Sequence, residues 1–415
     1  MAVFAWCLYD WAYSAFNTVV STFVIATWFV RAVAIDPATG TAQWGATQAI
    51  AGVIIALASA PLGAIADRGG RRRAMLAVFT GVIVLATAAL WFVHPTPADA
   101  MLALFLVCLA TISYEIATVF YNSMLPDVAG PRTIGRVSGM AWGCGYVGGL
   151  VCLGLCLVVL INPDPPLFGL NRAQAEPIRA TALFAAAWLA VFGWPVLAIR
   201  NTARPRPWTE ALRGGLAELS AALRRAARHP GLLRFLLARM LYTDGLTTLF
   251  AFGGIYAAGT FGLDARGVLM LGIGLNITAG IGALSFAFLE DRIGAKTTIL
   301  LSLAALVVLG LAALAAQSAA AFTPIALALG LFVGPAQAAS RSLMARISPE
   351  ESRNAHFGLY ALSGRVTGFV GPAALSAVTA ATGSQRAGML VISILLTAGG
   401  VLLAATRVQS ARAPL

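Results

Sequence analysis

The sequence is short of charged and titratable residues. Of its 415 residues only 11% are Asp, Glu, Lys or Arg, and only 3 are histidines, which do not cluster on any expected helix. The chain also lacks a His-Glu-x-x-His motif, a Gly-x-Ser-x-Gly motif and a glycine-rich phosphate-binding loop. These absences argue against metal-dependent hydrolysis, serine-nucleophile chemistry and ATP-driven transport. We therefore expect a protein that is not an enzyme.

Cysteine is scarce as well. The 5 cysteines are an odd number, and their spacing matches no metal-binding motif. This argues against a disulfide framework and against a zinc site, so cysteine should behave here as a small apolar residue. The sequence accordingly predicts neither a metal nor a cofactor. The cysteines are Cys7, Cys108, Cys144, Cys152 and Cys156.

Hydrophobic residues make up 59% of the chain, far more than a soluble domain of this length needs. They fall into twelve runs, each close to the roughly 20 residues that a membrane-spanning helix uses. The first run is too long for a signal-peptide core and has no clear cleavage site. The sequence predicts an all-α membrane protein with twelve transmembrane helices. The runs cover residues 2–30, 43–66, 74–94, 99–124, 133–161, 177–199, 231–261, 266–290, 297–318, 321–347, 355–382 and 386–406.

The net charge of +12 reflects the topology of the chain. Basic residues lie in short loops between apolar runs and form no nucleic-acid-reading module, so we expect no nucleic acid partner. With the N-terminus inside, few of the 28 Lys and Arg residues face outward. The positive-inside rule then places both termini in the cytoplasm, with the chain in the cell (inner) membrane. The outward-facing basic residues are Arg31, Arg172, Arg179, Arg266 and Arg386.

A charged loop at residues 63–73 carries Gly-Ala-Ile-Ala-Asp-Arg-Gly-Gly-Arg-Arg-Arg between two apolar runs. Its Asp67 can pair with a nearby arginine or sit at the start of a neighbouring helix, where the helix dipole favours an anion. A weaker copy, Glu-Asp-Arg-Ile-Gly-Ala-Lys, occupies residues 290–296. Read alone, such a loop is also compatible with an ordinary charged turn. We count Asp67 and Arg68 among the candidate gate residues.

The copied loop is one sign of a duplicated chain. At an offset of about 223 residues, Pro126, Gly135, Gly145 and Gly148 align with prolines and glycines of the second half. This predicts two pseudo-symmetric six-helix halves related by an axis along the membrane normal. The glycine-rich stretches around 135–149 and 364–371 should be close-packing or rocking surfaces. The expected parts are 1–199, a linker 200–230 with an amphipathic helix, 231–406, and a cytoplasmic tail 407–415.

Several motifs carry a family resemblance. The charged loop resembles the one between helices 2 and 3 of the major facilitator superfamily. Tyr-Asp-Trp-Ala at 9–12, Tyr-Thr-Asp-Gly at 242–245, Ser-Arg-Ser at 340–342 and Phe-Gly-Leu-Tyr at 357–360 are similar to those of the autophagy-related vacuolar amino-acid effluxers. The chain looks closer to their bacterial relatives, a branch once named the unknown major facilitators. The resemblance implies the major facilitator fold and, for the vacuolar members, amino-acid efflux. In this fold spans one, four, seven and ten line the central cavity.

Polar residues form a stripe on two of these spans. Span one carries Asp10, Ser14, Asn17 and Ser21 at intervals that place them on one helical face. Span four repeats the pattern, so both stripes should face the cavity. Hydrogen bonding to neighbouring helices is the alternative for the hydroxyl residues. The members on span four are Thr111, Glu115, Thr118 and Asn122.

Charged side chains within spans are functional candidates because they are costly in hydrocarbon. Asp10 and Glu115 are the leading proton-coupling candidates, since their pKa values would change as they pass between apolar and arginine-rich surroundings. They can also form an inner gate with Arg341 and Arg365, and the two roles are compatible. Asp244 is expected to line the cavity. Arg239, five residues earlier, is poorly spaced to pair with it, and Gln337 and Asn276 are weaker cavity candidates.

Together these features predict a secondary transporter that works by alternating access. We expect proton coupling and export of small polar or zwitterionic organic solutes, with amino acids favoured. The expected partners are a small-molecule substrate, protons and the lipid bilayer, and the protein should be a monomer. Two alternatives remain: a receptor or sensor that keeps the fold without turnover, and a facilitator for drugs, sugars or lipids.

Overall fold

The computed structural model describes residues 1–199, 207, 224 and 230–406 of the chain. The expected amphipathic helix of the 200–230 linker and the tail 407–415 lie outside the described residues. The first half is built from long helices and short helical turns. Its helices are α1 (Ala2–Ala15), α2 (Ile25–Trp28), α3 (Pro37–Gly69), α4 (Arg72–Ala89), α5 (Ala100–Ser123), α6 (Leu125–Val128), α7 (Ile134–Leu155) and α8 (Glu176–Gly193).

The second half repeats this plan with longer uninterrupted helices. Asp264, Ser318 and Ser384 cap three of its helices by accepting a hydrogen bond from a first-turn backbone N–H. The helices are α10 (Pro230–Phe261), α11 (Ala265–Ile293), α12 (Ala295–Ala315), α13 (Ala319–Ile347), α14 (Arg353–Ser363), α15 (Val370–Thr382) and α16 (Gln385–Ala404).

Ten helical segments among the described residues are long and apolar enough to cross a membrane. The expected spans at 231–261 and 355–382 are not among them. The first is the continuous helix α10, whose Arg234, Arg239 and Asp244 lower its hydropathy. An all-α membrane fold is therefore confirmed, while the count of twelve spans stays a prediction.

The expected span at 355–382 is not one continuous helix. Helix α14 ends at Ser363 and α15 begins at Val370, so the eleventh expected span is broken at 364–369. The break contains Gly364 and Gly368, and glycine destabilises a helix interior relative to most other residues. We call this segment the helix-11 break.

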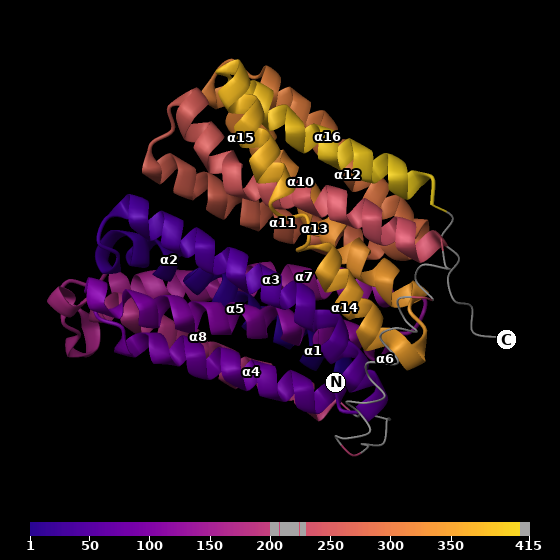
Figure 1. The fold of residues 1–415 in the computed structure, drawn as a ribbon, viewed down its shortest axis with the longest axis horizontal. Helices are drawn as coiled ribbons and strands as arrows, with labels where there is room; N and C mark the ends of the chain where they lie inside the picture. The colour runs from indigo at the N-terminus through magenta and orange to yellow at the C-terminus, as the bar shows by residue number, and fades with distance from the viewer. Residues whose placement is uncertain (200–206, 208–223, 225–229, 407–415) are drawn as a thin grey trace.

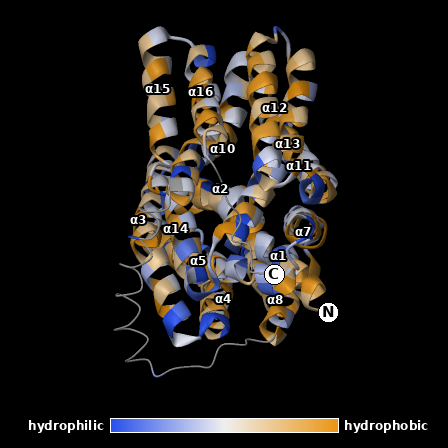
Figure 2. Ribbon diagram, turned by 90° about the vertical axis from the view of Figure 1, so that its right-hand side faces the viewer, coloured by the Kyte–Doolittle hydropathy of each residue, from blue (hydrophilic) through white to orange (hydrophobic). Residues whose placement is uncertain are grey.

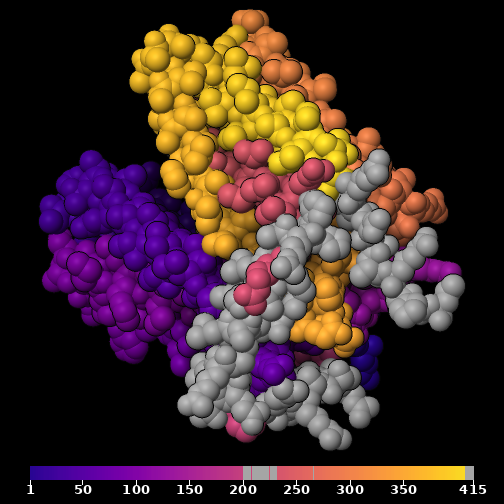
Figure 3. Space-filling model, turned by 45° about the vertical axis from the view of Figure 1, so that its right-hand side comes forward, coloured from indigo at the N-terminus to yellow at the C-terminus, as the bar shows by residue number. Residues whose placement is uncertain are grey.

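The helices form two lobes that meet at one end (Figure 1). The indigo-to-magenta lobe holds α1–α8, and the orange-to-yellow lobe holds α10–α16. Figure 3 shows a notch between the outer parts of the lobes, which join lower down. Hydrophobic residues run along most of the helices (Figure 2), and many large apolar side chains, among them Leu57, Leu85, Phe105 and Val308, are exposed. Such surfaces suit a hydrocarbon environment.

Glycines let the lobes touch through backbone at two places. A Cβ on Gly139 of α7 would lie 2.7 Å from the carbonyl oxygen of Ala283 on α11. A Cβ on Gly358 of α14 would lie 2.5 Å from the carbonyl oxygen of Ser59 on α3. The glycine-rich stretch 135–149 thus packs closely on its neighbours, as small residues at membrane helix interfaces do.

Candidate gate and transport site

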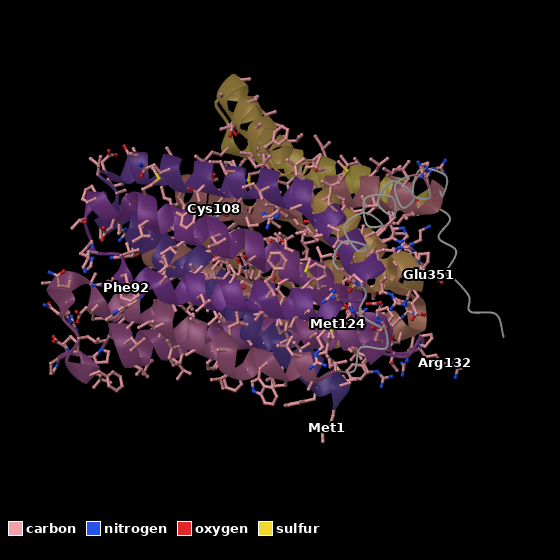
Figure 4. All side chains as sticks on the ribbon, turned by 60° about the horizontal axis from the view of Figure 1, so that its bottom comes forward. Met1, Phe92, Cys108, Met124, Arg132 and Glu351 are labelled. Carbon is pink, nitrogen blue, oxygen red and sulfur yellow. The ribbon has the colours of Figure 1, made fainter. Side chains whose placement is uncertain are left out.

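Contacts between the two lobes concentrate at one end of the molecule. Figure 4 shows Met1, Met124, Arg132 and Glu351 at this end, with Phe92 at the other. The chain segments around the C-terminal ends of α3, α5, α11 and α13 meet here. Basic residues lie in and beside these segments: Arg68, Arg71, Arg72, Arg73, Arg132, Arg136, Arg292, Lys296, Arg346 and Arg353. We call it the arginine-rich end.

Arg341 of α13 is the most enclosed cation of this interface. Its Nη1 lies 3.0 Å from Oδ2 of Asp10 on α1, and its side chain is only 3% exposed. Nη2 donates to the carbonyl oxygen of Ser138 at 2.7 Å, and Nε donates to the Ser138 hydroxyl at 3.0 Å. Nη1 also donates to Oδ1 of Asn122 at 3.3 Å. The guanidinium is therefore matched by a carboxylate and by neutral acceptors, which a buried charge requires.

Aromatic rings surround the same guanidinium. Its central carbon lies 4.7 Å from the ring centroid of Trp6, 5.8 Å from that of Tyr121 and 5.6 Å from that of Trp142. Cations are attracted to ring faces at such distances. All residues of this cage lie on α1, α5 and α7, so Arg341 inserts from one lobe into a site built by the other.

A second ion pair crosses the interface from the helix-11 break. Arg365 donates to Oε1 of Glu115 on α5, and both side chains are partly exposed. The structure thus brings Asp10 to Arg341 and Glu115 to Arg365, joining carboxylates of the first lobe to guanidinium groups of the second. What these pairs do during transport stays a prediction.

The remaining polar residues of the two expected stripes are placed differently from one another. Ser14 is half-buried on α1. The π-helical segment Phe16–Phe23, which follows α1, carries the exposed Asn17 and the half-buried Ser21. The Thr118 hydroxyl is bonded to Tyr13, and it also donates to the Tyr114 carbonyl at 3.0 Å. Thr111 is buried on α5. The stripe therefore mixes residues open to solvent with residues that bond neighbouring groups.

Asp67 also joins the two lobes. Its carboxylate accepts hydrogen bonds from the backbone N–H of Asn354 at 3.0 Å and of Ala355 at 2.8 Å, in the first turn of α14. The Asn354 side-chain amide donates to the same carboxylate. Of the two placements considered for Asp67, the structure shows the helix N-terminus, where the dipole favours a negative charge. Arg68 is exposed and forms no ion pair within 1–199 and 230–406.

Asp67→Asn should weaken this cross-lobe contact. The amide oxygen can still accept one hydrogen bond, but the charge is lost, and hydrogen bonds to charged groups are worth about 1.5–3 kcal/mol. We expect faster maleimide labelling of a Ser123→Cys reporter, placed in a chain whose native cysteines are replaced. Ser123 is fully buried and donates to Asn354 at 2.5 Å across the lobes. Arg68→Gln is the matched control. Equal labelling rates in Asp67→Asn and its parent would contradict the prediction.

Asp291, the counterpart of Asp67 in the second lobe, makes a related contact. It accepts a hydrogen bond from the backbone N–H of Arg136 at 3.2 Å in the first turn of α7. It also lies 3.5 Å from Arg136 Nε and 3.6 Å from an Arg346 nitrogen. The sequence repeat had aligned the two loops, so this residue was within reach of sequence reasoning.

Two further cross-lobe contacts were missed by sequence reasoning. Asp127 of α6 pairs with Arg353 at 2.8 Å. Arg346 donates to the carbonyl oxygen of Pro131 at 2.7 Å. Both arginines were counted among the cytoplasmic basic residues that predicted the orientation of the chain in the membrane. Nothing in their spacing indicated a partner.

The expectation that Asp244 lines the cavity is wrong. The residue is only 2% exposed, and its Oδ2 accepts a hydrogen bond from the backbone N–H of Gly371 at 2.9 Å inside the second lobe. Arg239 does not pair with it and instead donates to Tyr360 and Ser363 of α14. The helix-11 break, absent from the sequence prediction, supplies the partners of both.

The weaker cavity candidates lie near the lobe interface. Gln337 of α13 is half-buried, and its Oε1 accepts a hydrogen bond from Tyr146 of α7 at 3.3 Å, across the two lobes. The Asn276 amide donates to the Gly272 carbonyl of its own helix at 2.9 Å. Gln337 therefore joins the two lobes through a side-chain hydrogen bond between α13 and α7.

This combination of two lobes and a charged loop pointed to transporters, and comparison with known proteins gives the family. The family described as vacuole effluxer Atg22 like matches residues 40–135 and 132–414, which is most of the chain. The chain belongs to this family. An uncharacterized MFS-type transporter, YxiO of Bacillus subtilis, is 26% identical over 96% of this chain and 93% of its own length. Autophagy-related protein 22 of Pyricularia oryzae is 25% identical over 63% of this chain and 42% of its own.

Solved structures show the same fold for the Atg22-like chain. The proton:xylose symporter XylE superposes with a TM-score of 0.70 at 12% identity, over 96% of this chain and 94% of that one. The human organic anion transporter MFSD10 gives 0.67 at 18% identity, over 97% and 98%. The chain is thus an integral membrane transporter of the major facilitator type. Its match to the fungal relative spans less than half of that protein.

Proposed function

We propose that this Atg22-like chain is a proton-coupled secondary transporter that exports small polar or zwitterionic solutes by alternating access, with amino acids as the favoured class. The arginine-rich end faces the cytoplasm, in line with the positive-inside rule. The structure then corresponds to an outward-facing state, closed to the cytoplasm. The protein works as a monomer in the cell (inner) membrane.

The observation that carries this proposal is the one-sided closure of the lobes. Asp10–Arg341, Glu115–Arg365 and the Asp67 cap on α14 all cross the interface at the arginine-rich end. The lobes stand apart at the other end (Figure 3). Interfaces of this kind suit two discrete arrangements, because ion pairs that close one mouth must break when that mouth opens.

The solute class is inferred from the groups near the gate. Asn17 is exposed on the α1 side, and the Glu115–Arg365 pair is partly exposed between the lobes. A carboxylate and a guanidinium facing one space can bind the ammonium and carboxylate groups of a zwitterion. The effluxer description of the family supports export of such solutes.

Glu115→Gln tests proton coupling. The amide keeps the size of the side chain, but it can neither ionise nor attract Arg365 as a charge. We expect a folded protein in which a pH gradient no longer drives solute flux. The measurement is uptake of a labelled amino-acid mixture into proteoliposomes, with and without the gradient. Asp127→Asn, a change at the rim of the interface, is the control. An unchanged response to the gradient in Glu115→Gln would remove this residue from the coupling role.

A further inference from the structure

Two side chains of α10, those of Arg239 and Asp244, contact the two sides of the helix-11 break. Arg239 Nη1 donates to the Tyr360 carbonyl at 2.5 Å and to the Ser363 hydroxyl at 2.8 Å, at the last turn of α14. Its guanidinium also stacks on the Tyr360 ring, 3.5 Å from the centroid. Unsatisfied carbonyls and the negative end of the helix dipole gather at a helix C-terminus, so a cation is favoured there.

Asp244 meets the other side of the break. It accepts the backbone N–H of Gly371, in the first turn of α15, where the positive end of the dipole favours an anion. A Cβ on Gly371 would lie 3.0 Å from Asp244 Oδ1 and 2.2 Å from the Thr248 hydroxyl, so only glycine fits without a shift. The spacing of five residues on α10 is thus explained: each side chain binds one half of a broken helix.

Arg239 and Asp244 differ in how many polar partners surround them. Asp244 Oδ1 is buried and has no hydrogen-bond partner, and the residue as a whole is 2% exposed. Within 1–199 and 230–406, no cation lies within ion-pair distance of this carboxylate. A buried carboxylate without a cation costs several kcal/mol, and proteins avoid that cost by keeping such a group protonated. A neutral carboxylic acid avoids the cost of the buried charge, while Oδ2 still accepts the Gly371 hydrogen bond.

The groups that face Asp244 offer it no counter-charge. On its own helix, Arg239 is engaged with α14, and the Tyr242 hydroxyl is bonded to Ser340 of α13 at 2.7 Å. From α16, Leu395 packs beside Gly371. From the break itself, Arg365 points to Glu115 of the other lobe. Glu115 and Asp10 therefore have arginine partners in this state, whereas Asp244 has none.

We propose that Asp244 is a proton-binding site and that the helix-11 break couples its proton to the Glu115–Arg365 pair. The inference rests on the proposed function for its coupling role, but the proton itself does not depend on transport. In the present state Asp244 is a carboxylic acid. When α14 and α15 rearrange, water reaches the group, the acid gives its proton to that water, and the carboxylate remains bound at the N-terminus of α15. Arg365 lies in the break and moves with it. Its ion pair with Glu115 therefore changes with the protonation state of Asp244.

Infrared spectroscopy of the purified protein tests the proton directly. We expect a C=O stretching band of a protonated carboxylic acid at neutral pH, which Asp244→Asn removes and Asp127→Asn leaves unchanged. Asparagine can still accept the Gly371 hydrogen bond, so this variant should fold. Absence of the band in the wild type, or a carboxylic-acid C=O region in Asp244→Asn identical to that of the wild type, would overturn the proposal.

Proteoliposome uptake tests the coupling. Asp244→Asn should lose gradient-driven uptake and retain exchange of solute for solute, which needs no proton. Thr247→Val, an exposed change on the same helix that leaves the carboxyl site intact, should keep both. Gradient-driven uptake in Asp244→Asn equal to that of the wild type would overturn the coupling role. No gradient-driven uptake in the wild type would overturn the proposed function and this coupling with it, while the infrared band still decides whether Asp244 holds a proton.

Discussion

Arg341→Ala should open the arginine-rich end more than any other single side-chain truncation at the interface. It removes a guanidinium that is 3% exposed and leaves Asp10 without its cation. Removing one partner of a buried ion pair costs about 3–5 kcal/mol. Because Arg341 lies on one lobe and its cage on the other, this cost falls on the closed arrangement of the lobes. The fold of each lobe should be little affected.

Labelling of the Ser123→Cys reporter measures this effect. Each 1.4 kcal/mol is a factor of ten in an equilibrium constant, so the labelling rate should rise by about 100-fold or more. Arg136→Ala is the matched control, since its side chain is 46% exposed and its ion pair with Asp291 lies at the rim. A labelling rate in Arg341→Ala no greater than in the control would show that the caged arginine does not hold the gate shut.

Gly63→Val should prevent the arginine-rich end from closing. A Cβ on Gly63 of α3 would lie 2.3 Å from the carbonyl oxygen of Asn354 and 2.7 Å from its carbonyl carbon. Both atoms are backbone and belong to the other lobe, so no side chain can rotate away. The strain is relieved most easily by separating the lobes. We therefore expect a folded protein that is fixed open at this end and is inactive in transport.

Gly52→Val on the same helix is the control for Gly63→Val. A Cβ at Gly52 meets no atom within 4 Å, so this variant should keep wild-type labelling and uptake. The measurements are Ser123→Cys labelling, thermal unfolding and proteoliposome uptake. Slow labelling together with normal uptake in Gly63→Val would show that the closed end accommodates the added side chain, which contradicts the prediction.

Most of the fold and part of the gate could be predicted from the sequence. Apolar runs and the copied charged loop predicted a helical membrane protein of the major facilitator type, because hydrocarbon thickness and topology leave a strong pattern. Helical spacing also placed Asp10 and Glu115 on cavity-facing stripes. Sequence alone could not choose between two partners for Asp67, since a cap on α14 depends on how the lobes pack. The Asp127–Arg353 pair had no local pattern at all.

The helix-11 break shows where sequence reasoning ends. Gly364 and Gly368 were interpreted as a packing surface, although the same residues permit an interrupted helix. Arg239 and Asp244 were noted as poorly spaced for each other, and that misfit was the available signal. Their partners are backbone groups of α14 and α15, and backbone groups carry no sequence signature. The burial of Asp244 could be recognised only once the break was seen.

The measurement that tests alternating access most directly is electron–electron distance spectroscopy on two pairs of spin labels. One pair joins Arg132 and Glu351 at the arginine-rich end, and the other joins Thr41 and Thr382 at the opposite ends of α3 and α15; all four residues are exposed. Alternating access predicts that Arg341→Ala lengthens the first distance and shortens the second. If both distances stay unchanged, or change in the same direction, the two lobes do not alternate about a central site.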